Sequence, residues 1–599
     1  MNDTPRGDAR ILSFVDREWL RLTWLAWALI CAWYLVDRWP QVHWLALGDT
    51  DDNVRLAQVR ALLHGQSWFD LRQYRLNPPI GFDIHWSRLV DLPIAAIILL
   101  LQPFVGTGWA ERIACGVAPL LPLSLTMIGL SFTVRRLVSP LAWPLAIVFL
   151  LGCTVTLLMF MPERIDHHGW QLAMLSITVA GLADPRLARG GALVGAASAF
   201  SLTIGLEMLP YAAMAGGILG LRWALDRSEA PRLAAYALAL SGGSAIGYAG
   251  FASDANRVLR CDALTPVWLS TVVLAGALLF ALTRLNPAQR WVRMALGLVA
   301  AGVIAGFFAH FFPQCLGRPE QVSPELAKNW LDNVREAKPI YQHPFRAAFP
   351  IAALPVVGVI GAGLATWRAR RTPQIAGWLP VLLFTAFACA MLLWQVRAGP
   401  GAQLLAVPGA TALAWLVLPW FLNHRLLPVR VLGTVVAFLV VSGLFAGLMI
   451  QYLPIDRPSK RVEQVNHATG SCLSLPRLAA LNRYPAQTVF TFVDLGPRLI
   501  VTTHHSAIAG PYHRNGDAIL DVQHAFTGTA DNFRAIAKRH GASLLLICPN
   551  MAESTVYRAR SPGGFYGQLA HNQVPAWLVP LPVQRGTPFR LFRIAYGSP

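Results

Sequence analysis

Long apolar runs constrain the fold of this chain more than any other feature of its sequence. Thirteen runs are long enough, or nearly so, to cross a bilayer as helices. They fall near residues 19–36, 113–134, 140–160, 169–183, 191–208, 210–223, 233–250, 267–283, 293–311, 347–366, 376–395, 402–421 and 429–452. With 55% hydrophobic and 14% charged residues, the 599-residue chain has too little polar surface for a soluble globule. The sequence predicts a polytopic all-α membrane protein with about thirteen transmembrane helices.

The basic residues predict how these helices are oriented. Arg and Lys gather in alternate short loops, such as "VRRLVSP", "RLNPAQRWVR" and "WRARRTPQ", and short basic loops stay in the cytoplasm. Residues 89–105 are apolar but short and contain two prolines, so we interpret them as an interfacial or re-entrant segment. With this interpretation, every short cytoplasmic loop is basic and the N-terminus lies in the cytoplasm. The first apolar run is too long for a cleavable signal peptide.

This topology assigns four loops and the C-terminal region to the periplasm. The loops are residues 37–112, 161–168, 251–266 and 310–344. Residues 453–599 are long enough for a domain of their own beside the transmembrane domain 1–452. The apolar runs "TVFTFVDLG", "RLIVTT", "ASLLLICP", "WLVPLPV" and "FRLFRIAY" predict strands, and "TADNFRAIAKRHG" predicts an amphipathic helix. We therefore expect a periplasmic α/β domain.

Two further compositional features concern redox state and partners. Four cysteines fall in the predicted periplasmic parts, where pairs Cys261–Cys315 and Cys472–Cys548 are permitted; isolated buried thiols are the alternative. The net charge of +19 comes from scattered basic residues without interleaved aromatics, which argues against a nucleic-acid partner.

Acidic residues gather in three of the predicted periplasmic loops. They occur in "GDTDDNVRLAQVRALLHG", "PERIDHHGW" and "NVREAKPIYQHP": Asp49, Asp51, Asp52, Asp166 and Glu336. Acids at a helix start are often only caps. Carboxylates that converge from three loops, however, suit a hard divalent cation such as Mg²⁺ or Mn²⁺, and Mn²⁺ also accepts the imidazole of His168. The neighbouring His167 is expected to support a ligand rather than act as a base.

One arginine lies on the predicted periplasmic side, where the positive-inside rule gives no reason for a basic residue. Arg397 lies at the outer end of a predicted span, in "LLWQVRAGPGAQLLAVP". It is either a snorkelling anchor or a binding group for a lipid-linked phosphate, because its guanidinium offers a fork of donors beside the bilayer.

These features together resemble the GT-C glycosyltransferases, and most closely the catalytic subunit of oligosaccharyltransferase. Asp49, Asn53 and Arg55 keep the spacing of that family's first-loop motif. Asp166 and His168 resemble its second acidic pair, with His in place of an acid. The resemblance implies the following roles: Asp49, Asp166 and Glu336 catalytic; Asp49, Asp166 and His168 metal-binding; Arg397 bound to the donor phosphate.

The resemblance weakens at the acceptor motif. The family's Trp-Trp-Asp-Tyr-Gly is reduced to "FVDLG", where Asp494 and Gly496 remain and both tryptophans are absent. Transfer to the Asn-X-Ser/Thr sequon is therefore not implied. Further on, "TTHHSAIAGPYHRNGDAILD" offers candidates for a sugar or anionic acceptor, although "PYHRNGD" also reads as a simple turn. The acceptor candidates are Asp494, His505, Tyr512, His513 and Arg514.

The resemblance implies a metal-assisted transferase of the bacterial inner membrane. It would move a sugar or oligosaccharide from a polyprenyl-phosphate or -diphosphate donor to a periplasmic glycan, lipid or protein acceptor. A transporter or flippase of lipid-linked glycans is a second hypothesis, although no inverted repeat is visible. A non-catalytic cell-envelope assembly protein is a third.

Overall fold

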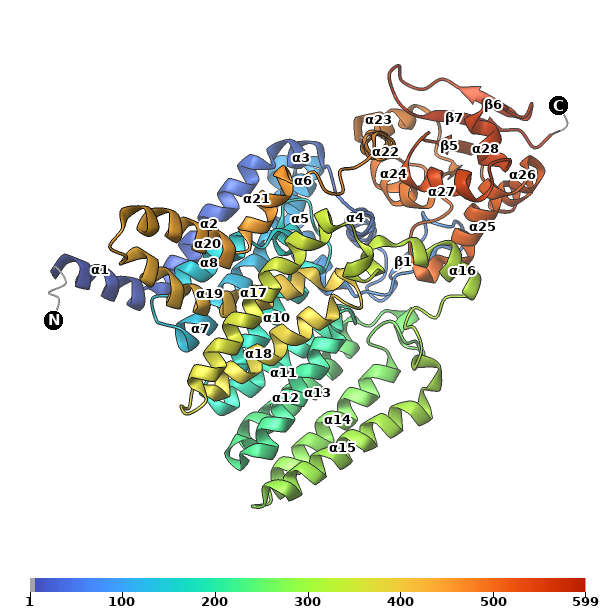
Figure 1. The fold of residues 1–599 in the computed structure, drawn as a ribbon. Helices are drawn as coiled ribbons and strands as arrows, with labels where there is room; N and C mark the ends of the chain where they lie inside the picture. The colour runs from blue at the N-terminus through green and yellow to red at the C-terminus, as the bar shows by residue number, and fades with distance from the viewer. Residues whose placement is uncertain (1–5, 474, 598–599) are drawn as a thin grey trace.

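The computed structural model describes residues 6–473 and 475–597, and each of the thirteen apolar segments is helical in it. The helices of these segments include α2 (Trp19–Asp37), α6 (Thr107–Val117), α7 (Leu120–Leu137), α8 (Trp143–Leu151), α10 (His168–Leu182), α11 (Leu187–Ile204), α12 (Leu209–Leu225), α13 (Ala230–Phe251), α14 (Pro266–Leu285), α15 (Arg290–Phe311), α17 (Phe345–Ala369), α18 (Ile375–Met391), α19 (Gly399–Leu422), α20 (Thr434–Val441) and α21 (Leu444–Tyr452), and α5 (Asp91–Val105) lies between α4 (Thr50–Leu63) and α6. They form one bundle, and the C-terminal α/β part lies at one end of it (Figure 1).

Length and composition show that the chain is a multi-pass membrane protein. Among the described residues, 8 helices are long and apolar enough to cross a bilayer, or up to 10 if each of two bent pairs is one span. The predicted count of thirteen spans is therefore not confirmed. The eight include Arg88–Val105, so our interpretation of residues 89–105 as a segment that does not span also remains a prediction.

Glycines let neighbouring helices approach closely. Helices α17 and α19 cross where a Cβ atom on Gly361 would lie 2.0 Å from the carbonyl oxygen of Gly409. Helices α11 and α13 meet in the same way, since a Cβ on Gly191 would lie 1.9 Å from the carbonyl oxygen of Arg232. In a lipid environment, where apolar burial drives helix association less, such close backbone packing stabilises the bundle.

The C-terminal part is a five-stranded mixed sheet surrounded by helices. The strand order is β4-β3-β5-β7-β6, with β3 parallel to β4 and β5, and β7 antiparallel to β5 and β6. The strands are β3 (Thr488–Phe490), β4 (Ser506–Ala507), β5 (Leu544–Ile547), β6 (Leu578–Leu581) and β7 (Arg590–Ile594). The helices include α22 (Lys460–Cys472), α24 (Gly496–Thr502), α25 (Gly516–Thr527), α26 (Ala530–Arg539), α27 (Ala552–Arg560) and α28 (Phe565–Ala570).

Four of the five predicted strands and the predicted amphipathic helix are present. The helix is α26, which Thr529 caps through the backbone N–H of Asn532, and the chain leaves it at Gly541 with φ +62°. The prediction that "RLIVTT" forms a strand is wrong, because these residues lie in α24. A short apolar run fits a buried helix as well as a strand, and Pro497 in the first turn of α24 favours the helix.

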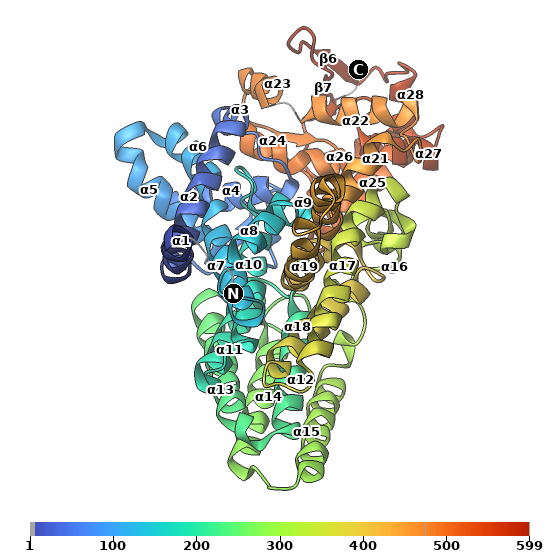
Figure 2. The same ribbon diagram turned by 60° about the vertical axis from the view of Figure 1, so that its left-hand side comes forward.

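The first long loop connects the bundle with the α/β part. Its helix α4 (Thr50–Leu63) packs against α24. Farther along the loop, the N–H of Ala507 in β4 donates to the carbonyl oxygen of Arg75 at 2.9 Å, and the N–H of Asn77 donates to Ala507 at 2.9 Å. Figure 2 shows α4 between the bundle and the α/β part. Loop and α/β part share one hydrophobic cluster that includes Leu76 and Phe490.

Both permitted disulfides are formed. Cys261–Cys315 joins the loop after α13 to the loop after α15, and Cys472–Cys548 joins α22 to the residue after β5. Isolated thiols are therefore excluded for these four residues. The free cysteines lie in or beside helices of the bundle: Cys31, Cys115, Cys153 and Cys389.

Candidate active site

Asp49 caps helix α4 and still presents one carboxylate oxygen outwards. Its Oδ1 accepts the backbone N–H of Thr50 at 2.6 Å, while Oδ2 of Asp52 accepts the N–H of Asp49 at 3.0 Å. The capping alternative is thus correct for both aspartates. Oδ2 of Asp49, however, faces another loop, and the Asp49 side chain is 44% exposed. Asp49 can therefore cap the helix and contact a ligand at once.

Arg164 gathers three carboxylates from two loops. One guanidinium nitrogen lies 2.6 Å from Oδ2 of Asp49 and 3.2 Å from Oδ2 of Asp52, and the other lies 2.8 Å from Oδ2 of Asp166. The N–H of Asp166 also donates to Asp52 at 3.0 Å. The loops of "GDTDDN" and "PERIDHH" therefore meet, as predicted. Arg164 was not predicted as a site residue, although it lies inside the second of these motifs.

Burial and neighbouring charges shift the pKa values of the acids in this cluster in different directions. Burial would raise the pKa of Asp166, but Arg164 and His168 hold it well below its usual range. Burial raises the pKa of Asp52 to about 8 in spite of Arg164. Burial, together with the charges of Asp49 and Asp166, raises the pKa of Asp51 to about 7. Near neutral pH, Asp166 is therefore ionised while Asp52 and Asp51 are partly protonated.

The donor atoms around Asp166 fit a divalent cation. Asp166, His167 and His168 can each offer one ligand atom within 4.8 Å of the others. His168 Nδ1 lies 2.9 Å from Oδ2 of Asp166, and the two groups form an ion pair. Asp49 and Asp166 bind different nitrogens of the Arg164 guanidinium. Of the predicted ligands, Asp166 and His168 therefore belong to this group, whereas Asp49 is linked to Asp166 through Arg164. Carboxylate oxygens with imidazole are a suitable donor set for a divalent cation.

His167 belongs to this group, but both of its ring nitrogens contact other residues. Its Nδ1 lies 3.3 Å from the Arg55 guanidinium and its Nε2 lies 3.1 Å from Oε1 of Glu207. Arg55, whose spacing matched the first-loop motif, is paired with buried Asp91 at 2.7 Å instead of contacting Asp49. Glu207 was not predicted as a site residue, because a single acid between two apolar runs gives no motif to detect.

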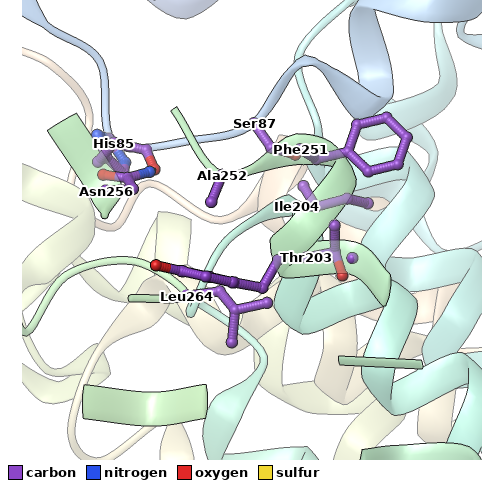
Figure 3. Close-up of a pocket in the computed structure, with 10 residues that line it drawn as sticks. His85, Ser87, Thr203, Ile204, Phe251, Ala252, Asn256 and Leu264 are labelled. Carbon is purple, nitrogen blue, oxygen red and sulfur yellow. The ribbon is translucent and has the colours of Figure 1, made fainter. Parts of the chain in front are cut away.

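A small cavity lies at the C-terminal ends of α11 and α13 (Figure 3). His85 and Asn256 lie together at its edge, and His85 Nε2 is 3.8 Å from Oε1 of Glu207. The side-chain oxygen of Asn256 is buried without a hydrogen-bond partner in the described structure. The cavity volume of about 10 Å³ has room for about one water molecule. This cavity is too small for a sugar.

Arg397 and Glu336 form an ion pair beside the carboxylate cluster. Arg397 lies in the turn Val396–Ala398 that precedes α19, within electrostatic range of Glu207 and Asp51. Glu336 is 58% exposed and contacts Arg397, not Arg164. The expectation that acids from three loops surround one centre therefore holds for Asp49 and Asp166, but Glu336 belongs to the Arg397 pair instead.

Asp494 and Tyr512 belong to the α/β part and lie near the carboxylate cluster. Asp494 is half-buried, and burial followed by the charge of Asp49 raises its pKa to about 6. Its loop is fixed by Glu553, which accepts the N–H groups of Val493 and Asp494 at 2.9 and 2.8 Å. Tyr512 is buried, with its hydroxyl beside Asp51. Two of the five acceptor candidates thus approach the carboxylate cluster.

The other three acceptor candidates have structural partners. Both ring nitrogens of His505 bond to backbone, at 3.0 Å to the oxygen of Leu481 and 3.2 Å to the nitrogen of Gln487. His513 and Arg514 pair with Asp262 of the loop after α13, at 2.6 and 2.7 Å. These three residues therefore hold the α/β part together and to the bundle, and their geometry does not favour ligand binding.

Comparison with solved structures identifies the fold. The archaeal oligosaccharyltransferase AglB from Archaeoglobus fulgidus, in complex with an inhibitory peptide and a dolichol-phosphate, gives a TM-score of 0.67 at 15% identity, over 95% of this chain and 73% of that one. An Archaeoglobus fulgidus oligosaccharyltransferase tethered to an acceptor peptide with the NVT sequon gives 0.66 at 15% identity, over 98% and 75%. One solved with Zn and sulfate gives 0.58 at 15% identity, over 92% and 69%. No family model and no curated protein matches the sequence. The chain therefore has the oligosaccharyltransferase form of the GT-C fold.

Proposed function

We propose that this protein is an integral-membrane glycosyltransferase that moves a sugar or oligosaccharide from a polyprenyl-phosphate or -diphosphate donor to an acceptor. The observation that carries this proposal is the carboxylate cluster of Asp49, Asp52 and Asp166 around Arg164, at the junction of a GT-C-fold bundle with its α/β part. A solved protein of the same fold is complexed with a dolichol-phosphate. That complex supports a lipid-linked donor here.

Arg397 would bind the donor's phosphate. It lies in the turn that precedes α19, within electrostatic range of Glu207 and Asp51, and its guanidinium offers paired donors to phosphate oxygens. Glu336 neutralises it in the absence of donor. An incoming phosphate would replace this carboxylate, because it provides more acceptor oxygens and more negative charge.

Asp49, Asp166 and His168 would hold a divalent cation. When bound, such an ion stabilises the negative charge of the departing phosphate. An imidazole in the donor set favours Mn²⁺ over Mg²⁺. A related fold solved with Zn and sulfate supports a metal site in general. Since Asp166 holds the His168 ring protonated, with a pKa of about 9 against the opposing effect of burial, cation binding must release a proton.

Asp49 would act on the acceptor. Its outward carboxylate oxygen is ionised, because Arg164 lowers the pKa of Asp49 against the effect of burial. This oxygen can orient an acceptor nucleophile and take its proton as the glycosidic bond forms. The anomeric carbon passes through an oxocarbenium-like state, so stabilisation of the phosphate and activation of the nucleophile must act together.

The same proposal includes the location of the enzyme. Basic short loops favour a cytoplasmic N-terminus, and disulfides on the opposite side favour an oxidising compartment. Both support the bacterial inner membrane with the α/β domain in the periplasm.

A transfer assay with purified protein tests the proposal. Polyprenyl-linked glycans extracted from the source membranes serve as donor, cell-envelope extract as acceptor, and release of lipid phosphate is measured. We expect cation-dependent turnover that falls at least 100-fold in Asp49→Asn and in Asp166→Asn. Glu325→Gln is the matched control, since that acid is exposed and pairs only with His524 in the described structure. Turnover that resists chelation and survives Asp166→Asn would refute the proposal.

A further inference from the structure

Glu207 lies in the turn between α11 and α12, and both of its carboxylate oxygens have polar neighbours. Oε1 lies 3.1 Å from Nε2 of His167 and 3.8 Å from Nε2 of His85. Oε2 accepts the side-chain amide N–H of Gln171 at 2.8 Å. His167 and Gln171 lie one turn apart at the start of α10, in the segment that carries Asp166. Glu207 is therefore bonded twice to the segment of the proposed cation site.

The same turn leaves room for this carboxylate at Gly205. A Cβ atom on Gly205 would lie 2.4 Å from Oε2 of Glu207. The backbone of Gly205 is extended, with φ −177° and ψ 170°, which any residue can adopt. The missing side chain is therefore needed for the position of the Glu207 carboxylate and not for the backbone conformation. An alanine at this position would displace the carboxylate without removing its charge.

The contacts of His167 fix its tautomer. Nδ1 lies 3.3 Å from a terminal nitrogen of the Arg55 guanidinium, and a guanidinium has only donors. Nδ1 must therefore accept a hydrogen bond, which leaves the ring proton on Nε2, and Nε2–H donates to Glu207. Both nitrogens of His167 are thus engaged, so this ring has no free lone pair for a cation although it lies within reach of Asp166 and His168.

The His167 ring in turn packs against His168. The two ring centroids are 4.5 Å apart and the ring planes are inclined by 24°. Trp86 also contacts His167, with 5.5 Å between centroids, and is held by its own hydrogen bond from Nε1 to Gln58 at 2.7 Å. The His168 ring therefore stacks on a ring that is fixed at both nitrogens, while its own Nδ1 lies 2.9 Å from Oδ2 of Asp166.

We propose that Glu207 is a positioning residue: its hydrogen bond to His167 holds the stacked His168 ring in the orientation that binds the divalent cation. This inference rests on the proposed function, in which His168 is a ligand. Carboxylates commonly orient metal-binding histidines by accepting a ring N–H directly. Here the carboxylate acts one residue away, through the stacked neighbour, and Glu207 is not itself a ligand.

Binding of Mn²⁺ to the purified full-length protein tests the inference without turnover. The EPR signal of free Mn²⁺ gives the Kd, and the spin-echo modulation of bound Mn²⁺ reports whether a histidine nitrogen is a ligand. In Glu207→Leu we expect the Kd to rise about tenfold or more and the nitrogen signal to weaken. Glu207→Gln keeps an oxygen that accepts from Nε2–H of His167, so its Kd should stay within about threefold of the native value.

Gly205→Ala is a second variant that keeps the charge of Glu207 but displaces its carboxylate. The atom in the way of the new methyl group is the far end of a flexible side chain, so the turn itself can keep its fold. We expect this variant to bind Mn²⁺ as weakly as Glu207→Leu does. If Glu207→Leu does not fold, Gly205→Ala decides the question alone.

Two controls separate positioning from general effects on folding. Glu229→Gln removes an acid in the turn between α12 and α13, where Glu229 pairs with Arg222 and Arg232. It should lower the melting temperature, because both arginines lose a counter-ion, and leave the Kd for Mn²⁺ unchanged. Gly217→Ala on α12 adds a methyl group in open space and should change neither quantity.

The outcomes distinguish this inference from the proposed function. Native-like Kd and nitrogen signal in Gly205→Ala would overturn the positioning role. Equally weak binding in Glu207→Gln and Glu207→Leu would overturn it too, since the charge of Glu207 rather than its hydrogen bond would then set the affinity. A native protein that binds no Mn²⁺ has no site to position, which also overturns it. Failure of the proposed function appears separately, as a native protein that binds Mn²⁺ but releases no lipid phosphate.

Discussion

Arg164 acts as an internal cation at the centre of the site. Three carboxylates surround its guanidinium, and the Asp166 side chain is fully buried. Removing one partner of a buried ion pair costs about 3–5 kcal/mol, because the remaining charge lies in a medium of low dielectric constant. In the absence of a divalent ion, therefore, Arg164 keeps the two loops together.

Arg164→Gln should weaken the metal-free protein and strengthen cation binding. We expect a lower melting temperature with EDTA and a larger rise on adding Mn²⁺ than in the native protein, because the competing positive charge is gone. Thermal unfolding in detergent, with and without Mn²⁺, measures both effects. Arg539→Gln is the control, since that arginine pairs with Asp521 on the surface. A smaller Mn²⁺-induced shift in Arg164→Gln would contradict a cation site at this position.

For single residues of the site, the sequence predicts the acids better than it predicts their partners. Asp49, Asp166 and His168 stand in short motifs; in the structure His168 contacts Asp166, and Asp49 is linked to Asp166 through Arg164. Arg164 and Glu207 were missed, because a lone charged residue carries no sign of which distant loop it will contact. His505 was predicted to bind the acceptor because "TTHH" gives no sign of its structural partners. Those partners are backbone atoms that are distant in sequence.

Among the elements, the bundle helices follow directly from the apolar runs, whereas their contacts depend on glycines whose role the sequence does not show. Gly361 is the clearest case, because its Cα lies against the backbone of α19.

Gly361→Ala should destabilise the bundle by about 1–3 kcal/mol, since the new methyl group would lie 2.0 Å from a backbone oxygen and the helices must separate. Gly363→Ala, on the same helix, is the control: its Cβ would find its nearest neighbour 3.9 Å away. Loss of folded protein with increasing SDS in mixed micelles measures the difference. Equal stability of the two variants would disprove the tight α17–α19 crossing.

The segment that carries Glu336 is a second element whose position matters. It is docked by two backbone hydrogen bonds, from Ile340 N–H to Leu392 at 2.9 Å and from Val396 N–H to Lys338 at 2.8 Å. Glu336 therefore lies on Arg397, where the donor phosphate would bind.

Glu336→Gln should lower the donor KM several-fold, because the phosphate no longer competes with a carboxylate for Arg397. Steady-state kinetics with varied donor concentration measure this, with Glu325→Gln as the control from the same loop. If Glu336→Gln instead lowers kcat at constant KM, Glu336 acts in catalysis, as the family resemblance implied, and the counter-ion interpretation is wrong.

For the whole molecule, the attachment of the α/β part should depend on pH. Arg514 and His513 hold the pKa of Asp262 well below its usual range although burial acts in the opposite direction. A depressed folded-state pKa contributes stability that is present above the ordinary Asp pKa of about 3.9 and is lost as the pH falls below it.

At pH 7, the Asp262→Asn variant should therefore be less stable than the native protein. Between pH 5 and pH 3, the variant should lose less stability than the native protein does. Hydrogen exchange of residues 506–516 at several pH values reports on this attachment directly. Asp531→Asn, at the start of α26, is the control on the α/β part. Identical exchange in Asp262→Asn and the native protein at pH 7 would show that the ion pairs do not hold the α/β part in place.

The orientation of the whole molecule connects its charge pattern with its chemistry. The basic turn between α14 and α15 lies at the end opposite the α/β part (Figure 2), while both disulfides lie towards the α/β end. The positive loops and the disulfides thus independently support the proposed orientation, in which the α/β end lies in the periplasm. In spheroplasts, a membrane-impermeant maleimide should label a Gln584→Cys variant, in the loop after β6, and should label an Ala288→Cys variant only after permeabilisation. Both variants are made in a background in which the four free cysteines, Cys31, Cys115, Cys153 and Cys389, are replaced by Ala. The native disulfides do not react with maleimide, so each variant then reports on its own position. The reverse labelling would leave the disulfides in a reducing compartment and the carboxylate cluster facing the cytoplasm, which excludes a periplasmic acceptor. This measurement therefore tests on which side of the membrane the proposed reaction takes place.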